Sequence, residues 1–284
     1  MKWNQNFIGR LKVEKNKLIK ISDEDYFAVK ALSNSGVKNL NKTPANFLVE
    51  VKRTDAMAFG SLVHCLVLEP SEYGKRYCLA PIIDKRTKQG KLDWSAFVAE
   101  NQDKEVLTAE NVVLAGLVRD SILSHEIYGA TFSDILDTCQ TEQSIFWDQD
   151  FDGEFTVPCK GKIDFISEKY GIMGDLKTAA DGSPDSYRNV VYNENTGLYI
   201  QSAFYRLPEL TQGYKFIFPV VEKKPPFCTA VYYVDDETMD EAYNKIKQAA
   251  EIYKHGMDTG IWSSQYNEEP VKLKPAGWFY YKQV

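Results

Sequence analysis

The 284-residue chain is 44% hydrophobic and 13% aromatic and has a formal net charge of −6 at pH 7. This apolar content fills one large core, or a core with a small subdomain. No signal peptide, transmembrane run, low-complexity segment or internal repeat is visible, which excludes a membrane-spanning or repeat protein, and we expect a cytoplasmic protein without a membrane partner.

The five cysteines are odd in number and scattered, and none forms a Cys-x-x-Cys pair. They are Cys65, Cys78, Cys139, Cys159 and Cys228. This usage indicates a reducing cytoplasm and argues against zinc and against a disulfide framework.

The N-terminal segment is basic, in contrast to the rest of the chain. Residues 1–53 contain 11 Lys and Arg against 5 Asp and Glu, a balance of +6, so the remainder carries −12. We expect this segment to be a partly helical extension. A negative total charge argues against a protein whose whole surface binds nucleic acid, although an acidic exterior around a basic channel would still be compatible with such binding.

Thr54–Leu68 is apolar on nearly every face, which predicts a buried helix that Pro70 ends. This segment contains His64, one of three histidines in the chain. A lone histidine in such a helix is more often a hydrogen-bonded core residue than a metal ligand, and the sequence alone leaves both interpretations open.

A second basic run, Lys85–Lys91, contains four cations and one glycine. It predicts either a flexible loop that contacts phosphate or a solvated surface, and the solvated surface is the commoner case for an isolated charge run. Helices are predicted over Trp94–Glu100 and Ala109–His125 from their helical spacing.

Glu142–Trp147 predicts a strand, and Asp152-Gly153 predicts a turn after it. Glu142 is either a carboxylate that supports a site from outside or a charge at a strand end. The sequence favours the strand-end charge.

The strongest chemical signal is a predicted hairpin with strands Cys159–Ile166 and Gly174–Thr178, joined by the polar loop Ser167–Gly171. Folding the strands symmetrically about the loop places Asp164 opposite Asp175. Directly opposed residues have Cβ atoms about 4.5–5.5 Å apart. The hairpin therefore predicts two carboxylates in close proximity.

Two like charges so close destabilise a fold unless something neutralises them, and a divalent cation between them does so most simply. Lys177 lies two residues after Asp175 and therefore on the same face of its strand, where its ammonium suits an anion held against the metal. Two acids, a metal and a lysine together indicate metal-assisted phosphodiester hydrolysis.

This spacing matches the PD-(D/E)XK nuclease pattern, in which one acid lies on the first strand and an acid-x-lysine triplet on the next. The triplet alone is weak evidence, because surface hairpins carry it by chance. The alternative is an exposed hairpin with solvated acids. Against it, four apolar residues make the strands half-buried: Ile163, Phe165, Ile172 and Leu176.

Downstream, Asn193–Leu207 predicts a helix that Pro208 ends. Gln201 and Tyr205 are four residues apart and so lie on one face of it. This pair alone fits two interpretations equally well: a functional site, or a polar glutamine that only happens to lie on a packed helix. The candidate N-caps are Asn193, Asn195 and Thr196.

Two further strands, Tyr214–Val221 and Thr229–Val234, precede a long helix from Asp235 or Asp236 to Gly256. The order of elements predicts an α/β core with a mixed, twisted sheet flanked by helices. The inner face of the long helix carries Met239, Ala242, Tyr243, Ile246, Ala249 and Tyr253.

In order and spacing, these motifs resemble the exonuclease VIII (RecE-type) nuclease domain of phages and prophages, a RecB-like branch of the PD-(D/E)XK nucleases. The similar region runs from about Ile21 to Trp262 and implies a restriction-endonuclease-like core. The segments that carry it are Phe59–His64 with Leu68–Pro70, Lys85–Lys91, Glu142–Trp147, Cys159–Asp164, Gly174–Thr178 and Gln201–Tyr205.

The resemblance also implies roles for individual residues. Lys177 would be the catalytic lysine, and Gln201 and Tyr205 would lie beside the scissile phosphate. The acid of the triplet is Asp, where the wider superfamily often has Glu and this branch has Asp. The metal ligands would be His64, Asp164, Asp175 and the backbone carbonyl of Leu176.

The implied cofactor is Mg²⁺, for which Mn²⁺ would substitute. Some relatives carry an iron–sulfur cluster bound by cysteines after the core, and we expect none here because only Cys228 follows it. The implied partners are double-stranded DNA attacked from its 5′ ends, a single-strand annealing recombinase, and further copies of the chain in a ring-shaped homo-oligomer.

We therefore predict a Mg²⁺-dependent, processive exodeoxyribonuclease on linear duplex DNA. Its predicted parts are the N-terminal extension (1–53), the nuclease domain (54–262) and a C-terminal tail (263–284). Two alternatives remain: an endonuclease on the same fold, and a non-catalytic DNA-binding relative. The second is disfavoured because Asp164, Asp175 and Lys177 are all present.

Overall fold

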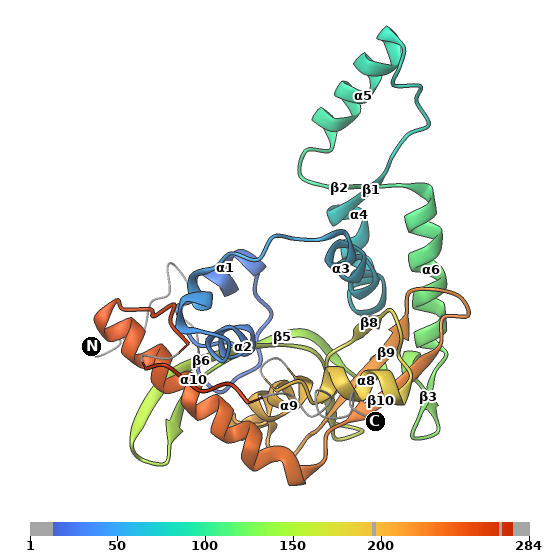
Figure 1. Ribbon diagram of the computed structural model, residues 1–284. Helices are drawn as coiled ribbons and strands as arrows, with labels where there is room; N and C mark the ends of the chain where they lie inside the picture. The colour runs from blue at the N-terminus through green and yellow to red at the C-terminus, as the bar shows by residue number, and fades with distance from the viewer. Residues whose placement is uncertain (1–13, 195–196, 267–268, 275–284) are drawn as a thin grey trace, which may run out of the picture.

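The computed structural model describes residues 14–194, 197–266 and 269–274, in which a mixed six-stranded sheet lies between helices (Figure 1). The strands run in the order β10-β9-β7-β6-β5, with β8 beside β9. β7 and β8 are parallel to β9, and the other pairs are antiparallel. The predicted α/β class with a mixed sheet is confirmed. The strands are β5 (Gln140–Phe151), β6 (Phe155–Ser167), β7 (Ile172–Gly174), β8 (Lys177–Ala179), β9 (Lys215–Glu222) and β10 (Thr229–Tyr233).

Two short strand pairs and ten α-helices complete the described part of the chain. The pairs are β1 (Tyr77–Leu79) with β2 (Glu105–Leu107), which is parallel, and β3 (Glu126–Ile127) with β4 (Ala130–Thr131), which is antiparallel. None of the described helices combines the length and the apolar character needed to cross a membrane. The helices are α1 (Asp23–Ala28), α2 (Asn34–Leu40), α3 (Asp55–Leu68), α4 (Tyr73–Arg76), α5 (Lys88–Glu100), α6 (Ala109–Leu123), α7 (Phe132–Leu136), α8 (Pro184–Val191), α9 (Leu198–Tyr205) and α10 (Met239–Thr259).

Helices cover both faces of the sheet because the strands are apolar on both faces. Along β9, Ile217 and Val221 pack with α3, α6 and α7, whereas Phe216, Phe218 and Val220 pack with α2, α8, α9 and α10. This alternation is the two-residue period of a strand. Strands buried on both sides read as apolar runs, which explains the sequence of β9.

Where it is described, the N-terminal segment contains the helices α1 and α2. It packs onto the same core as the sheet: Leu32, Val37 and Leu40 are buried against residues of β5, β6 and α10. Isolated bridges also join Ile19 to Ser144 and Leu32 to Cys159. Its helices are therefore held by the core of the sheet, while the boundary at residue 53 stays a prediction.

The observed helices differ from the predicted ones in their limits and in their burial. Helix α9 begins at Leu198, after Gly197, and not at Asn193; the candidate caps at 195 and 196 lie outside the described residues. Helix α10 continues past Gly256 to Gly260, whose φ of 75° ends it in the left-handed conformation. Helix α3 is fully buried only from Leu62 onward, because its earlier residues are exposed or half-buried.

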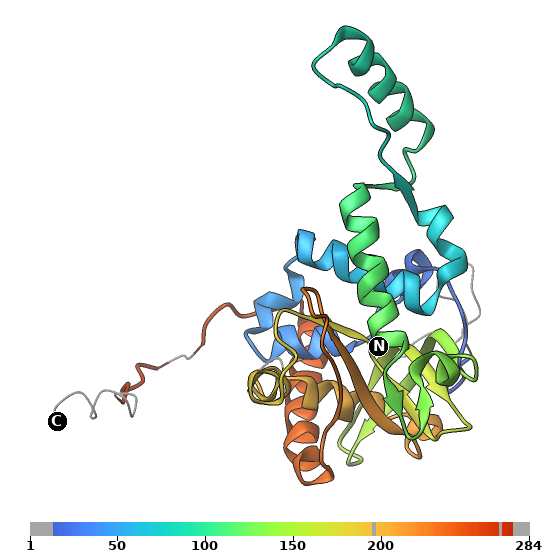
Figure 2. The ribbon, with the colours of Figure 1, turned by 90° about the vertical axis from the view of Figure 1, so that its right-hand side faces the viewer.

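The run Lys85–Lys91 is not a flexible loop. Thr87 caps α5 by accepting a hydrogen bond from Gly90, so the second half of the run forms the first turn of that helix. The ammonium of Lys85 lies 3.0 Å from the centre of the Trp94 ring. Both views show α5 standing away from the body on the β1–β2 pair (Figures 1 and 2). Of the predicted C-terminal tail, 263–266 and 269–274 are described and contain no helix or strand.

Candidate active site

The predicted hairpin has the predicted register. β6 and β7 are antiparallel, and Phe165 pairs with Gly174, which places the next residues along each strand, Asp164 and Asp175, across from one another. Gly174 is required here, because a Cβ at this position would lie 2.3 Å from the carbonyl oxygen of Ile217. The close approach of three strands therefore fixes where the two carboxylates meet.

The second strand of the hairpin is interrupted at Asp175 and Leu176, so the prediction of one continuous strand is wrong. β7 ends at Gly174 and β8 begins at Lys177, yet both keep the same offset in their pairing with β9. In the interval, the backbone N–H of Leu176 donates to Asp164 Oδ2 at 2.8 Å. The interruption thus redirects a backbone donor from the sheet to a carboxylate.

Glu142 lies across from Asp164 on the other side of β6. Thr141 pairs with Phe165 and Gln143 with Ile163, so Glu142 occupies the position between them. Its φ of 55° is left-handed, a conformation that costs a residue other than glycine about 1 kcal/mol or more. Such strain persists only where the surrounding structure imposes it, and it is concentrated at functional sites.

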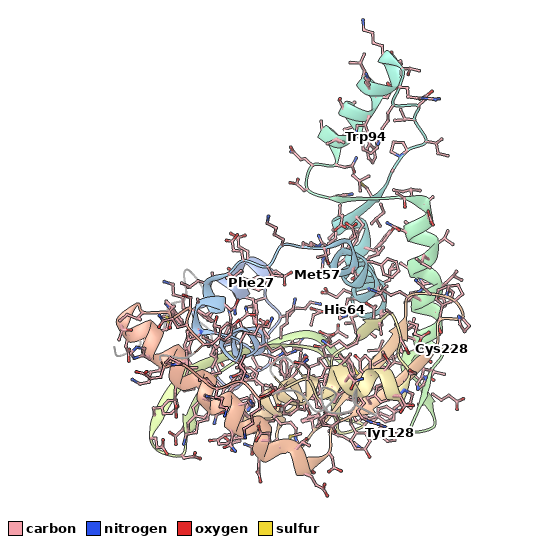
Figure 3. All side chains as sticks on the ribbon, viewed as in Figure 1. Phe27, Met57, His64, Trp94, Tyr128 and Cys228 are labelled. Atoms are coloured by element: carbon pink, nitrogen blue, oxygen red, sulfur yellow. The ribbon has the colours of Figure 1, made fainter. Side chains whose placement is uncertain are left out.

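His64 completes a cluster of possible metal ligands. From α3, its Nδ1 lies 3.3 Å from Asp164 Oδ2. His64, Glu142 and Asp164 each present a donor atom, and all three atoms lie within 4.8 Å of one another. Figure 3 shows His64 on the side of α3 that faces the sheet. An imidazole with two carboxylates is a donor set that suits divalent metal ions.

The two aspartates differ in electrostatic environment. Burial raises the pKa of Asp164 well above its usual range, and the charges of Asp175 and Glu142 raise it further. Burial lowers the pKa of His64, which favours the neutral imidazole that binds metals. A metal ion would supply the positive charge that the Asp164 carboxylate lacks, and the neutral imidazole of His64 offers that ion a lone pair.

Asp175 is held as an anion by its neighbours. Burial alone would raise its pKa, but Lys177, His64 and two hydrogen bonds outweigh burial, and the pKa lies below its usual value. Lys177 Nζ lies 2.6 Å from Asp175 Oδ1, and Gln201 donates its amide to Oδ2. The predicted catalytic lysine and the predicted glutamine thus meet on one carboxylate.

Tyr205 packs against β6 and holds the part of this strand that carries Asp164. Its hydroxyl donates to the backbone carbonyl of Lys162 at 2.8 Å, two residues before Asp164. A Cβ at position 161 would lie 2.7 Å from the Tyr205 ring, so Gly161 lets the ring pack against the strand. Burial raises the pKa of Tyr205 well above its usual value, so its hydroxyl stays a hydrogen-bond donor.

The structure gathers the predicted residues and adds others. Asp175 is not in the described three-residue cluster, and its role as a metal ligand stays a prediction. Glu142 is at the centre of the site, not a mere strand-end charge. Symmetric folding about a two-residue Asp152-Gly153 turn would place Glu142 opposite Ile163. The observed loop has three residues, since Phe151 pairs with Phe155, and this extra residue shifts Glu142 to the position opposite Asp164. Lys38, described below, had no signal in the sequence.

Comparison with known proteins places this geometry in a family. The family model described as a PDDEXK-like domain of unknown function (DUF3799) matches residues 30–269. The chain belongs to this PDDEXK-like family. No curated protein shows a significant match to the sequence.

A solved structure shares the fold of this chain. A "putative exonuclease" from Eubacterium rectale is similar over 93% of this chain and 99% of its own, with 16% identity and a TM-score of 0.55. At that identity the likeness shows the fold alone. The structure of SSO0001 aligns over 75% of this chain and 84% of its own with 14% identity, and its TM-score of 0.28 is too low to support a shared fold.

Proposed function

We propose that this PDDEXK-like chain is a metal-dependent deoxyribonuclease that hydrolyses phosphodiester bonds of linear duplex DNA from its ends. The observation that carries the proposal is the placement of a three-donor cluster, His64, Glu142 and Asp164, beside the Asp175–Lys177 pair. A metal-binding cluster next to an ammonium suits a reaction in which negative charge develops on phosphate oxygens.

A divalent metal ion fits the cluster, because the cluster combines two carboxylates and a histidine whose lowered pKa keeps its lone pair available. We propose Mg²⁺ as the physiological ion, with Mn²⁺ as a substitute, and Asp175 and the carbonyl of Leu176 as further ligands. When bound, such an ion polarises the phosphate and lowers the pKa of a water molecule.

The other residues of the site hold the reacting groups in position and balance their charge. Lys177 orients the attacking water and offsets negative charge on the phosphate. Gln201 holds Asp175 through its amide, and Tyr205 holds the β6 backbone that carries Asp164. Gln201 and Tyr205 together keep the carboxylates in place next to the scissile phosphate.

The finer assignment follows the resemblance to RecE-type exonucleases. We propose cytoplasmic, processive 5′-to-3′ degradation in phage-type recombination, by a ring-shaped homo-oligomer that cooperates with a single-strand annealing recombinase. The fold neighbour is itself described as a "putative exonuclease", which is in line with this proposal. The basic run Lys85–Lys91 would contact the phosphates of the duplex from α5.

The test is cleavage of matched linear and covalently closed circular duplexes with Mg²⁺, using linear DNA labelled at either the 5′ or the 3′ end. An exonuclease degrades the linear DNA and leaves the circle intact, and a 5′-to-3′ enzyme releases the 5′ label first. Asp175→Asn should abolish cleavage and Asp185→Asn, at an exposed residue, should not. Cut circles would show an endonuclease, and near-wild-type cleavage by Asp175→Asn would refute the site.

A further inference from the structure

Helix α2 brings an additional cation to the catalytic centre. Lys38 Nζ lies 3.4 Å from Oε1 of Gln201, whose amide nitrogen donates to Asp175. One end of the amide therefore faces an ammonium and the other a carboxylate, which fixes the direction in which the amide points. Because α2 packs against α9, the core that positions Gln201 also positions Lys38.

Lys38 has no anionic partner of its own. Within the described residues, no carboxylate lies at ion-pair distance from its ammonium, and the neutral oxygen of Gln201 is its one hydrogen-bond acceptor. Burial, followed by the charge of nearby Lys177, lowers the pKa of Lys38 to about 8, and the opposing charge of Asp175 does not offset these two effects. A half-buried ammonium held near a like charge is destabilising until an anion joins it.

The other two lysines at the centre are already paired. Lys177 lies 2.6 Å from Asp175. Lys162 Nζ lies 2.8 Å from Glu142 Oε2 and 2.8 Å from Asp23 Oδ1. Of these three ammonium groups, that of Lys38 alone is left to take an incoming anion.

We propose that Lys38 binds a non-bridging oxygen of the DNA phosphate that enters the site, and so holds the strand against the metal-binding cluster and Lys177. This assignment rests on the proposed nuclease function and adds a substrate contact to it. It also gives the basic N-terminal segment a direct part in substrate binding. Inorganic phosphate offers the same chemistry, so a test has to distinguish the two sources.

Lys38→Met removes the ammonium and keeps most of the side-chain volume. The affinity of a short duplex oligonucleotide is measured by fluorescence anisotropy in EDTA over a series of salt concentrations, because EDTA prevents cleavage. Loss of one phosphate contact lowers the slope of log K against log salt by about 0.9. In steady-state cleavage, KM should rise about tenfold with kcat nearly unchanged, as for a contact made equally in the ground and transition states.

Lys30→Met is the matched control, because Lys30 is exposed in the same basic segment. It should leave KM unchanged, and Lys38→Arg should restore the salt slope. If Lys38→Met does not fold, the same measurements are made on Lys38→Gln, which keeps a polar partner for Gln201 and should give the same changes. Inorganic phosphate is titrated as competitor against wild-type protein and Lys38→Met.

An unchanged salt slope and KM in Lys38→Met would overturn the assignment. An unchanged slope combined with loss of inhibition by inorganic phosphate would show that Lys38 binds the free anion and not DNA, which also overturns it. If wild-type protein neither binds nor cleaves DNA, the proposed function itself fails and takes the assignment with it. If wild-type protein cleaves DNA normally and Lys38→Met has the wild-type salt slope and KM, the assignment of Lys38 fails while the proposed function stands.

Discussion

Replacing Glu142 by glutamine keeps the volume of the side chain and removes its charge, so it separates a metal ligand from a structural ion pair. Without metal, two effects oppose one another: repulsion from Asp164 is relieved, and the 2.8 Å pair with Lys162 is lost. Lys162 retains Asp23, and its side chain is 24% exposed. We therefore expect the metal-free Tm of Glu142→Gln to differ little from that of wild type.

The difference should appear when metal is added. At a metal concentration of about 100 Kd, a ligand stabilises a protein by about 2.7 kcal/mol. Loss of one of the three donors weakens binding at least about 10- to 100-fold, which reduces this stabilisation by about 1.3–2.3 kcal/mol. For a chain of this size, the metal-induced rise in Tm should shrink by about 3–9 °C.

The assay is thermal unfolding with and without Mg²⁺ or Mn²⁺. Glu69→Gln is the control, since Glu69 is a buried glutamate at the end of α3 that pairs with Lys20 and Arg76, away from the cluster. It should lower the Tm equally in both conditions. A metal-induced rise for Glu142→Gln within about 1 °C of the wild-type rise would refute the ligand role and leave Glu142 as the partner of Lys162.

Three further predictions concern Lys177, His64 and the buried Lys160. Lys177→Ala should lower turnover by about 10²–10³-fold with little change in metal affinity by calorimetry; a variant that loses metal binding but keeps turnover at saturating Mg²⁺ would show a structural lysine. His64→Ala should abolish cleavage at temperatures where circular dichroism shows an intact fold, and surviving activity there would show that the imidazole is only a packed core group. Burial lowers the pKa of Lys160 to about 8 from an unfolded value of 10.5, so the folded state binds fewer protons between these values. Relative to Lys160→Met, wild type should therefore gain unfolding free energy as pH rises from 8 to 10 in urea titrations, and a constant difference would contradict this.

The hairpin could be predicted because its information is local. A polar loop between two apolar runs sets the register, and the register alone places Asp164 across from Asp175. The interruption at Leu176 was not predictable in the same way. It exists because a backbone N–H turns to Asp164, and no residue type encodes that choice.

Contacts between distant segments limited the rest of the prediction. Lys38 and Gln201 are 163 positions apart, and their meeting depends on how α2 and α9 pack on the sheet. His64 could be suspected from its apolar helix, but its distance from Asp164 depends on where α3 crosses the sheet. The place of Glu142 opposite Asp164 depends on a three-residue loop where the sequence predicts a two-residue turn, and its left-handed backbone was not predictable either.

The segment around α5 is attached to the body at one place only. β1 and β2 pair side by side, so the two ends of residues 80–104 emerge close together, and Gly90 is the one buried residue of α5. A helix of this length without tertiary packing is marginal in water, so it can unfold and refold while the sheet stays intact. Loops of this kind tolerate insertion and deletion because their ends already meet. Evolution can therefore lengthen, shorten or replace this projection without disturbing the carboxylates beneath it.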